Sequence, residues 1–296
     1  PSVGADKCVT PRPYTWPDFL KLSNVLGVAN QTAIYAIIAI GMTMVIITGG
    51  IDLSVGSLVA LASVTSAVLI RDLFGGTDAN VALMVLGLAA GVGICALAGA
   101  YHGLLVTTFR VPAFVVTLGM MMMARGLARR MSAGQSISDT ELPDSFFWLG
   151  GGETFGIANP ILLMILLYVF AHIVMTRTRF GRYVYAIGGN EKAAWLSGVP
   201  VRYVLIAVYT ICGALAGLGG VVLASQLQAG DPKFGMMLEL EVIAAVVVGG
   251  TSLLGGRGKI FGTLIGAFII AVIKNGMNLT GVDPDNQLIV LGAVLT

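Results

Sequence analysis

Few side chains in this sequence are suited to chemistry, and they do not form a catalytic set. The two histidines, His102 and His172, are far apart, and we expect each to be a structural residue at the end of an apolar run. The pair Gly258-Lys259 has no glycine five residues earlier and no hydroxyl after it, so it is not a nucleotide-binding phosphate loop. The three cysteines have neither metal-ligand spacing nor a disulfide pattern. We therefore expect no catalytic residue, cofactor or metal, and energy for any active transport must come from an ion gradient or another subunit.

The composition places most of the chain in a membrane. Hydrophobic residues make up 56% of the sequence, charged residues only 11%, and the mean hydropathy is +0.91. Soluble domains carry about 25% charged residues, so a water-soluble fold is excluded. The net charge of +2 gives no reason to expect nucleic acid as a partner. Membrane lipid is the expected environment.

Apolar runs predict an all-α, polytopic membrane bundle that occupies residues 1–296 as a single domain. Runs of about 20 apolar residues are long enough to cross a bilayer as helices. Such runs are found at about 29–49, 53–70, 80–100, 111–129, 158–176, 202–224 and 259–280, with a shorter one at about 238–250 and a truncated one from about 286. We interpret the sequence as an excerpt, with helical sequence missing at one or both ends.

The charges of two connections predict the orientation of the bundle. The loop 177–202 carries five basic residues against one acid, whereas 132–157 carries four acids and no lysine or arginine. Because basic loops stay inside, we expect 177–202 to be cytoplasmic and 132–157 to be outside. The polar segment 1–28 is then periplasmic or interfacial. The arginines of 125–130 oppose this rule, so the orientation rests on the 177–202 loop.

A glycine-rich hinge separates the first two apolar runs and contains a carboxylate, Asp52. Glycines can break a helix at membrane depth where the freed backbone is buried or lines a cavity. Asp52 could cap the next helix through the amide of Ser54 or Val55, or it could form a gate or face another subunit that supplies energy. A second segment, 249–253, repeats part of this spacing and suggests a pseudo-symmetric repeat. The candidate hinge or gate residues are Gly49, Gly50, Asp52, Gly56, Gly249 and Gly250.

Other polar residues inside the apolar runs are few. Only Lys274 among the ionisable residues lies well inside a span, and it could extend to the interface. Ion-coupled carriers use buried ionisable residues to bind and pass ions or protons, so a bundle with so few of them is poorly suited to a proton relay. A set of uncharged polar residues could face a solute pathway or only join helices by hydrogen bonds: Asn30, Gln31, Thr117, Asn275 and Asn278. Glycines repeated every fourth residue, as at 87–91, 99–103, 213–217 and 258–266, predict close helix packing.

The basic loop contains a short predicted helix. Asn190 is a good N-cap, Gly198 suits the position after the helix, and Pro200 prevents continuation. A helix of about seven residues is unstable alone, so it must dock on something. Trp195 and Leu196 suit insertion into a partner's groove. The alternative is a connecting helix packed on its own bundle.

Three segments carry a resemblance to a known family: GMTMVIITGGIDLSVGS (41–57), FGRYVYAIGGNEKAAWLSGV (180–199) and AAVVVGGTSLLGGRGKIFGTLIGA (244–267). In this order they closely resemble the permease subunits of bacterial monosaccharide ABC importers, the ribose, xylose, arabinose, galactose and autoinducer-2 group. The resemblance extends nearly from end to end of the chain. Branched-chain amino acid permeases look like more distant relatives, because the GGIDLSVGS hinge points to the sugar group.

The resemblance implies a ten-helix permease of the bacterial inner membrane with a core like that of cobalamin importers. Such a permease works by alternating access, as one of a pair of identical or related subunits, with cytoplasmic ATPase subunits and a periplasmic sugar-binding protein. In the family, a loop like 188–198 forms the coupling helix that enters the ATPase surface. The residues carried over to that role are Asn190, Glu191, Lys192, Ala193, Ala194, Trp195, Leu196 and Ser197. The chain departs from the family at its ends, where the first helix is absent and the last is cut, which leaves about nine spans.

Two other classes of function stay open from the sequence. An ion-coupled secondary transporter would take up solute without a partner. A membrane scaffold or receptor would carry no solute with any partner.

Overall fold

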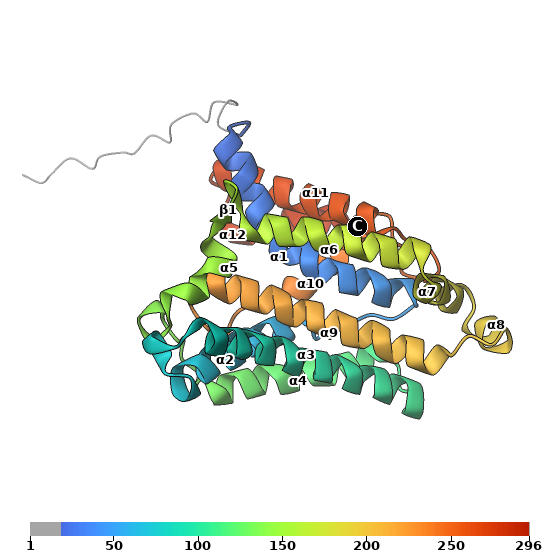
Figure 1. Cartoon of the computed structure of the whole chain (residues 1–296). Helices are drawn as coiled ribbons and strands as arrows, with labels where there is room; N and C mark the ends of the chain where they lie inside the picture. The colour runs from blue at the N-terminus through green and yellow to red at the C-terminus, as the bar shows by residue number, and fades with distance from the viewer. Residues whose placement is uncertain (1–18, 296) are drawn as a thin grey trace, which may run out of the picture.

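The computed structural model describes residues 19–295, which form a bundle of roughly parallel and antiparallel helices (Figure 1). Residues 1–18 of the predicted outer segment 1–28 lie outside the described residues. The long helices are α1 (Leu22–Ile47), α2 (Val55–Leu73), α3 (Val81–Phe109), α4 (Ala113–Met131), α6 (Asn159–Arg177), α9 (Val201–Gln226) and α11 (Ile260–Leu279). The shorter ones are α5 (Trp148–Gly151), α7 (Arg179–Gly189), α8 (Glu191–Leu196), α10 (Leu238–Val248) and α12 (Pro284–Leu295), with 3-10 turns η2 (Gly76–Asp78), η3 (Asp139–Glu141) and η4 (Asp144–Phe147).

The mostly helical architecture agrees with the sequence-based prediction, with one small exception. Two-residue strands β1 (Glu153–Thr154) and β2 (Ile157–Ala158) pair antiparallel, with Glu153 opposite Ala158. They form a hairpin in the predicted outer connection because Phe155 and Gly156 both adopt positive φ, at 57° and 73°. The hairpin leads directly into α6 and does not alter the helical bundle.

Six helices of the described chain are long and apolar enough to cross a membrane: α1, α2, α3, α6, α9 and α11. The fold is therefore that of a polytopic helical membrane protein. Helix α4 is also 19 residues long, but it carries three arginines toward its end. Helices α10 and α12 contain only 11 and 12 residues. That α4, α10 and α12 also lie in the membrane, for a total of about nine spans, stays a prediction.

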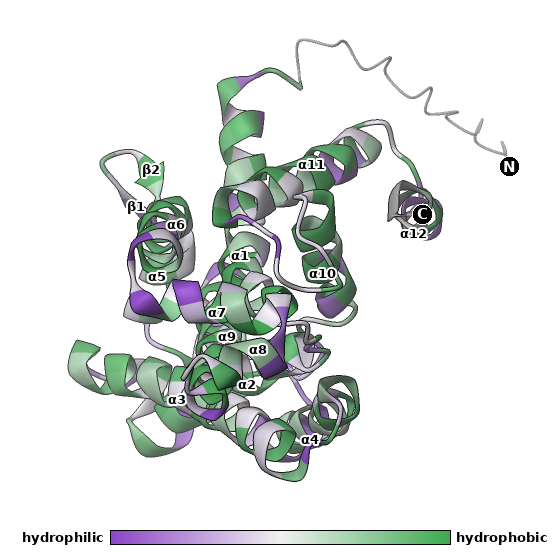
Figure 2. Ribbon diagram, turned by 90° about the vertical axis from the view of Figure 1, so that its right-hand side faces the viewer, coloured by the Kyte–Doolittle hydropathy of each residue, from purple (hydrophilic) through white to green (hydrophobic). Residues whose placement is uncertain are grey.

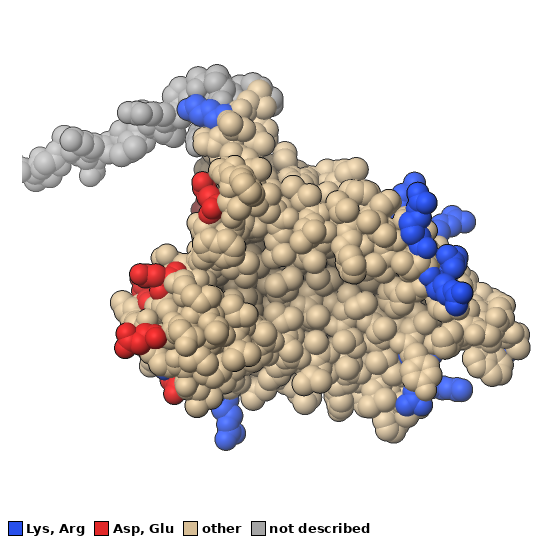
Figure 3. Space-filling view, viewed as in Figure 1, with Lys and Arg blue, Asp and Glu red and all other residues tan. Residues whose placement is uncertain are grey.

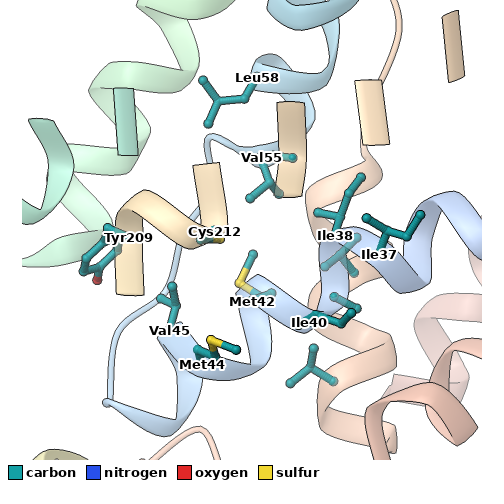
Figure 4. Packing of buried hydrophobic residues seen from close by; sticks show 14 of the residues in the cluster. Ile37, Ile38, Ile40, Met42, Met44, Val45, Val55, Leu58, Tyr209 and Cys212 are labelled. Atoms are coloured by element: carbon teal, nitrogen blue, oxygen red, sulfur yellow. The ribbon is translucent and has the colours of Figure 1, made fainter. Parts of the chain in front are cut away.

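The core lies along α1 and α2, which the other helices surround. The most apolar stretch of α1 is 83% buried, whereas that of α3 is only 22% buried. Many large apolar side chains of α3 and α11 are exposed, as expected for helices that face lipid. Figure 2 shows hydrophobic residues along most of α3. In the core, Met42 and Val45 of α1 lie beside Tyr209 and Cys212 of α9 (Figure 4).

The predicted glycine repeats pack helices together. Gly99 and Gly103 of α3 face the backbone of α9, and Gly213 of α9 faces the Cys95 carbonyl of α3 in return. A Cβ atom at any of these glycines would overlap the opposing backbone. Gly87 and Gly91 lie against α2, and Gly266 lies against α10. Close approach of this kind lets helices without a hydrophobic driving force pack tightly in lipid.

The two ends of the bundle differ in charge. On the face shown in Figure 3, lysine and arginine side chains gather at the end that carries α7 and α8, and most acidic side chains lie at the opposite end. We call the end with α7 and α8 the basic end. Helix α3 extends further toward it than predicted, to Phe109 instead of about residue 100, and there Arg110 at φ 53° and Pro112 end the helix. The prediction was wrong because His102 looked like a span end, whereas its side chain is buried within the helix.

Candidate functional site

The first hinge leaves the backbone without regular structure between Ile47 and Val55. Gly49 adopts φ 82°, which ends α1 and turns the chain. Asp52 is fully buried, and its Oδ1 accepts hydrogen bonds from the Ser54 amide at 2.9 Å and the Ser54 hydroxyl at 2.6 Å. The predicted contact with the Ser54 amide is confirmed. Ser54 itself is the N-cap of α2, so Asp52 positions the cap from the turn before it.

The second hinge follows α10 and touches the first. Gly250 adopts φ 87°, and the Ser252 hydroxyl accepts from the Leu254 amide at 3.3 Å, two residues on, as Asp52 does with Ser54. The Gly256 amide donates to the carbonyl of Ile47 at 2.8 Å. The predicted repeat therefore has a local counterpart in geometry, although the turn glycines, Gly49 and Gly250, are offset by one position.

Helix α7 completes this contact. Gly188 lies against the Ile47 carbonyl so closely that a Cβ atom would overlap it. The Tyr185 hydroxyl donates to the Gly258 carbonyl at 2.8 Å, and partial burial raises the pKa of Tyr185, which keeps this donor protonated. The three segments that carry the family resemblance, 41–57, 180–199 and 244–267, thus meet at the basic end of the bundle.

Helix α8 extends from this junction, as predicted for 190–198. Asn190 Oδ1 caps the helix by accepting from the Ala193 amide at 2.9 Å, and Gly198 ends it at φ 83°. Ala194 is buried against the bundle, whereas Trp195 is 66% and Leu196 72% exposed. A Trp–Leu pair with most of its surface exposed contributes little to packing within the described chain.

A cavity of about 630 Å³ lies between α8, the first hinge and the end of α3. Its lining includes Gly50 and Thr48 of the hinge, Arg110, Trp195 and Tyr209. The cavity opens at the basic end, so a movement of α8 would change its shape. Residues of the first hinge and of the exposed helix α8 therefore line the same cavity.

The prediction that His102 is a satisfied structural residue at the end of a span was wrong. His102 is fully buried in α3 with neither ring nitrogen hydrogen-bonded, and its Nδ1 lies 3.8 Å from Asp52 Oδ2. The partly exposed Lys274 has partners within the bundle: its Nζ bonds Glu241 Oε1 at 2.8 Å and lies 5.4 Å from the centre of the Tyr35 ring. Its extension to the interface stays a prediction. The bundle therefore holds more internal ionisable groups than its sequence indicated.

The five candidate pathway residues do not form one connected track. Thr117 is fully buried and its hydroxyl donates to the Ile51 carbonyl of the hinge at 3.3 Å. Asn275 exchanges hydrogen bonds with Asn24 at 3.1 and 3.2 Å, and Asn278 accepts from Gln287 at 2.8 Å. These two asparagines therefore form hydrogen bonds between helices or to a loop, which was the alternative to a role in the solute pathway. In the first half of α1, Gln31 is exposed, whereas the Oδ1 of Asn30 is buried without a partner.

A further segment runs back along α2 and was not predicted from the sequence. Residues 227–237 connect α9 to α10, and Gly230 pairs with Ile137 while the Asp231 amide donates to Ser63 of α2. Arg125 of α4 holds the segment, because its Nη1 donates to the carbonyls of residues 232 and 234 at 2.9 and 2.6 Å. Only the positions of Gly230 and Gly235 hinted at an irregular path. Among residues 19–295 no group of three or more His, Cys, Asp or Glu is placed to hold a metal ion.

Six helices suited to a membrane, broken segments buried at their ends and an exposed helix beyond them define a multi-pass membrane permease. The chain belongs to the family described as "Branched-chain amino acid transport system / permease component", whose profile matches residues 24–296. The resemblance inferred from the three motifs is confirmed, and the chain is a permease component of a bacterial ABC importer, not an enzyme. Permeases of such importers generally work with ATPase and binding-protein partners.

Individual relatives are similar over most of their length. The ribose import permease protein of Escherichia coli K12 is 42% identical over 281 residues, which cover 94% of this chain and 85% of that protein. The corresponding protein of Bacillus subtilis 168 is 44% identical over 279 residues, covering 94% and 84%. An L-arabinose ABC transporter permease of Azospirillum brasilense is 38% identical over 281 residues, covering 95% and 80%. No solved structure matches the chain.

Proposed function

We propose that this chain moves a monosaccharide, a pentose or a hexose-like sugar, across the bacterial inner membrane by alternating access. Relatives named as ribose and L-arabinose permeases support a sugar, and a D-allose permease of Escherichia coli K12 at 34% identity supports the same class. The permease has the ten-helix type of the family and pairs with a second copy or a related subunit. A periplasmic sugar-binding protein delivers the solute, and cytoplasmic ATPase subunits supply the energy.

The observation that carries the coupling mechanism is the exposure of Trp195 and Leu196 on a capped helix at the basic end. Basic loops favour the cytoplasmic side, so this helix is directed toward the ATPase subunits. At the basic end, where lysine and arginine side chains gather, the two side chains do not face the lipid interior (Figure 3). An aromatic and an aliphatic residue together suit a groove on a partner, where buried aromatic anchors supply most of the affinity. Asn190–Ser197 thus form the coupling helix.

The two hinges act as the gate that this helix moves. Gly49 and Gly250, both at positive φ, turn the chain after α1 and α10, with Gly50 and Gly249 beside them, and Asp52 holds the start of α2. Gly56, predicted as a hinge residue, lies instead within the first turn of α2. Because α7 lies on the Ile47 carbonyl, a displacement of the 180–199 segment reaches both hinges through direct contacts. No step here requires a covalent bond to the solute.

The test is the double variant Trp195→Arg, Leu196→Asp. We expect it to insert normally but to lose the ATPase subunits on purification and to lose uptake of D-ribose. Trp148→Arg is the matched control, because Trp148 is 60% exposed at the opposite end and its replacement must leave ATPase association intact. Full transport by the double variant would refute the coupling role.

An ion-coupled secondary transporter is the main alternative, and the buried Asp52–His102 pair and the half-buried Glu241–Lys274 pair are the observations in its favour. It predicts uphill uptake by the reconstituted chain alone, abolished when the ion gradient is dissipated. The proposed function predicts no uptake without ATPase subunits and ATP.

A branched-chain amino acid permease is the second alternative, favoured by the description of the family. Competition separates the two classes of substrate. Excess ribose or arabinose must reduce the uptake of D-ribose by the assembled importer, and excess leucine must not.

A further inference from the structure

His102 and Asp52 form an incomplete polar contact in the interior of the bundle. Both side chains are 0% exposed, and neither Asp52 Oδ2 nor the ring nitrogens of His102 make a hydrogen bond of standard geometry, although the Cys212 side chain of α9 also lies close to Asp52. Buried polar atoms are normally paired, because leaving them unpaired costs free energy. The 3.8 Å between His102 Nδ1 and Asp52 Oδ2 exceeds a hydrogen-bond distance by less than 1 Å. A small displacement of either residue would therefore complete or break the bond.

His102 belongs to a rigid pair of helices. It lies on α3 between Gly99 and Gly103, where an added Cβ atom would overlap the backbone of α9. Its ring also meets Tyr209 of α9 edge-on, with centroids 6.4 Å apart and planes at 89°. Helix α9 begins at Val201, directly after α8 and Pro200. A movement of α8 is thus carried by α9 and α3 to the His102 ring.

Asp52 belongs to the part that would be moved. Its other oxygen holds Ser54, the N-cap of α2. Close to it in α2, Gly56 lies against the carbonyl of Gly235, in the segment that leads into α10, and against the carboxylate of Glu239, in the first turn of α10. A shift of Asp52 therefore reaches the start of α2 and, through Gly56, the segment 227–237.

We propose that His102 is a positioning residue that transmits the movement of the coupling helix to the α2 hinge through Asp52. The proposal rests on the proposed function of α8, and it extends it by naming the contact where motion passes into the gate. The His102–Asp52 hydrogen bond closes in one state of the transport cycle and opens in another. His102 touches neither the solute nor the ATPase.

The test compares transport with ATP hydrolysis in the complete importer, reconstituted with its ATPase subunits and binding protein, with D-ribose as the first solute. His102→Gln and Asp52→Asn each keep a polar side chain of similar size. We expect both variants to assemble and hydrolyse ATP but to move about tenfold less sugar per ATP hydrolysed, in the range of typical coupling energies. The double variant must be no worse than either single variant, because both remove the same contact. His172→Gln, a change of the other histidine, must keep the wild-type ratio.

Different results overturn different claims. The proposal fails if an assembled His102→Gln importer keeps the wild-type ratio, or if the two substitutions act independently and their effects multiply. If His102→Gln does not assemble, Asp52→Asn decides the matter alone, since it preserves the shape of the side chain. If the Trp195→Arg, Leu196→Asp variant transports normally, the coupling role of α8 fails. If that variant loses its ATPase while His102→Gln couples normally, only the transmission through His102 fails.

Discussion

The backbone amide of Gly256 donates a hydrogen bond to the carbonyl oxygen of Ile47, with 2.8 Å between nitrogen and oxygen. This bond joins the end of α1 to the second hinge, two segments far apart in the sequence. Gly188 of α7 lies against the same carbonyl, so one peptide group of α1 is the meeting point of all three family motifs. Only glycine permits that approach, because any Cβ atom at 188 would occupy the space of the carbonyl.

Gly188→Ala is expected to destabilise the junction. The added methyl group must displace α7 from α1, and overpacking of this kind costs about 1–3 kcal/mol. Thermal unfolding of the purified protein in detergent measures the loss. Gly189→Ala is the matched control, because a Cβ atom there meets nothing within 4 Å. Equal unfolding temperatures for the two variants would mean that the contact at Ile47 contributes nothing to stability.

Tyr185→Phe tests a second contact of the same junction. It removes the hydroxyl that donates to the Gly258 carbonyl at 2.8 Å, and loss of one such bond costs about 1 kcal/mol. Partial burial raises the pKa of Tyr185 above its ordinary value, so the folded state holds this proton more tightly than the unfolded state. The stabilisation is complete below the ordinary tyrosine pKa of about 10 and declines as the pH rises through the folded value. The stability difference from wild type must therefore shrink above about pH 10; a constant difference would contradict this origin.

Much of the local structure could be predicted from the sequence because it depends on nearby residues. The cap at Asn190, the turn at Gly198 and the stop at Pro200 define α8 within eleven positions. The spacing of Gly99 and Gly103 predicts a close helix contact whatever the partner helix is. Long apolar runs likewise predict membrane helices by their length alone.

The ionisable pairs could not be predicted, because each joins residues from distant segments. His102 looked like a residue at a span end, and only its packing between α3 and α9 reveals that it faces Asp52. Glu241 lies in the first turn of a short helix, where the favourable interaction of an acidic side chain with the helix N-terminus already explains its presence. Its bond to Lys274 depends on how α10 packs on α11, which no local pattern specifies.

Removal of Lys274 alone is expected to be worse than removal of the pair. Lys274→Met leaves the Glu241 carboxylate half-buried beside Tyr35 without its partner, whereas Lys274→Met with Glu241→Gln leaves no charge to neutralise. Contacting residues of this kind show interaction energies of about 0.5–3 kcal/mol in double-mutant cycles. The cycle is measured by unfolding in detergent. Additive effects of the two substitutions would show that the pair is not coupled.

Arg125→Ala is expected to release segment 227–237. In the wild-type chain, Nη1 of Arg125 donates to two carbonyls of the segment, those of Pro232 and Phe234, at 2.9 and 2.6 Å. Hydrogen bonds from a charged donor contribute about 1.5–3 kcal/mol, so their loss must raise the open population about tenfold or more. A cysteine placed at Phe234, which is half-buried, reports opening through its rate of reaction with a membrane-impermeant maleimide, after subtraction of the parent chain's labelling.

Arg129→Ala is the control for that experiment, because Arg129 is exposed on the same helix, one turn away. It removes the same charge from α4 without touching the segment, so the labelling rate at position 234 must stay at the wild-type value. Arg125→Lys separates charge from geometry. A lysine keeps the charge on a differently shaped side chain, which cannot reproduce the guanidinium geometry at both carbonyls. Labelling must therefore rise with lysine as well, though less than with alanine.

A wild-type labelling rate in Arg125→Ala would contradict the prediction. It would mean that the hydrogen bonds to α2 and Ile137 hold the segment without the arginine.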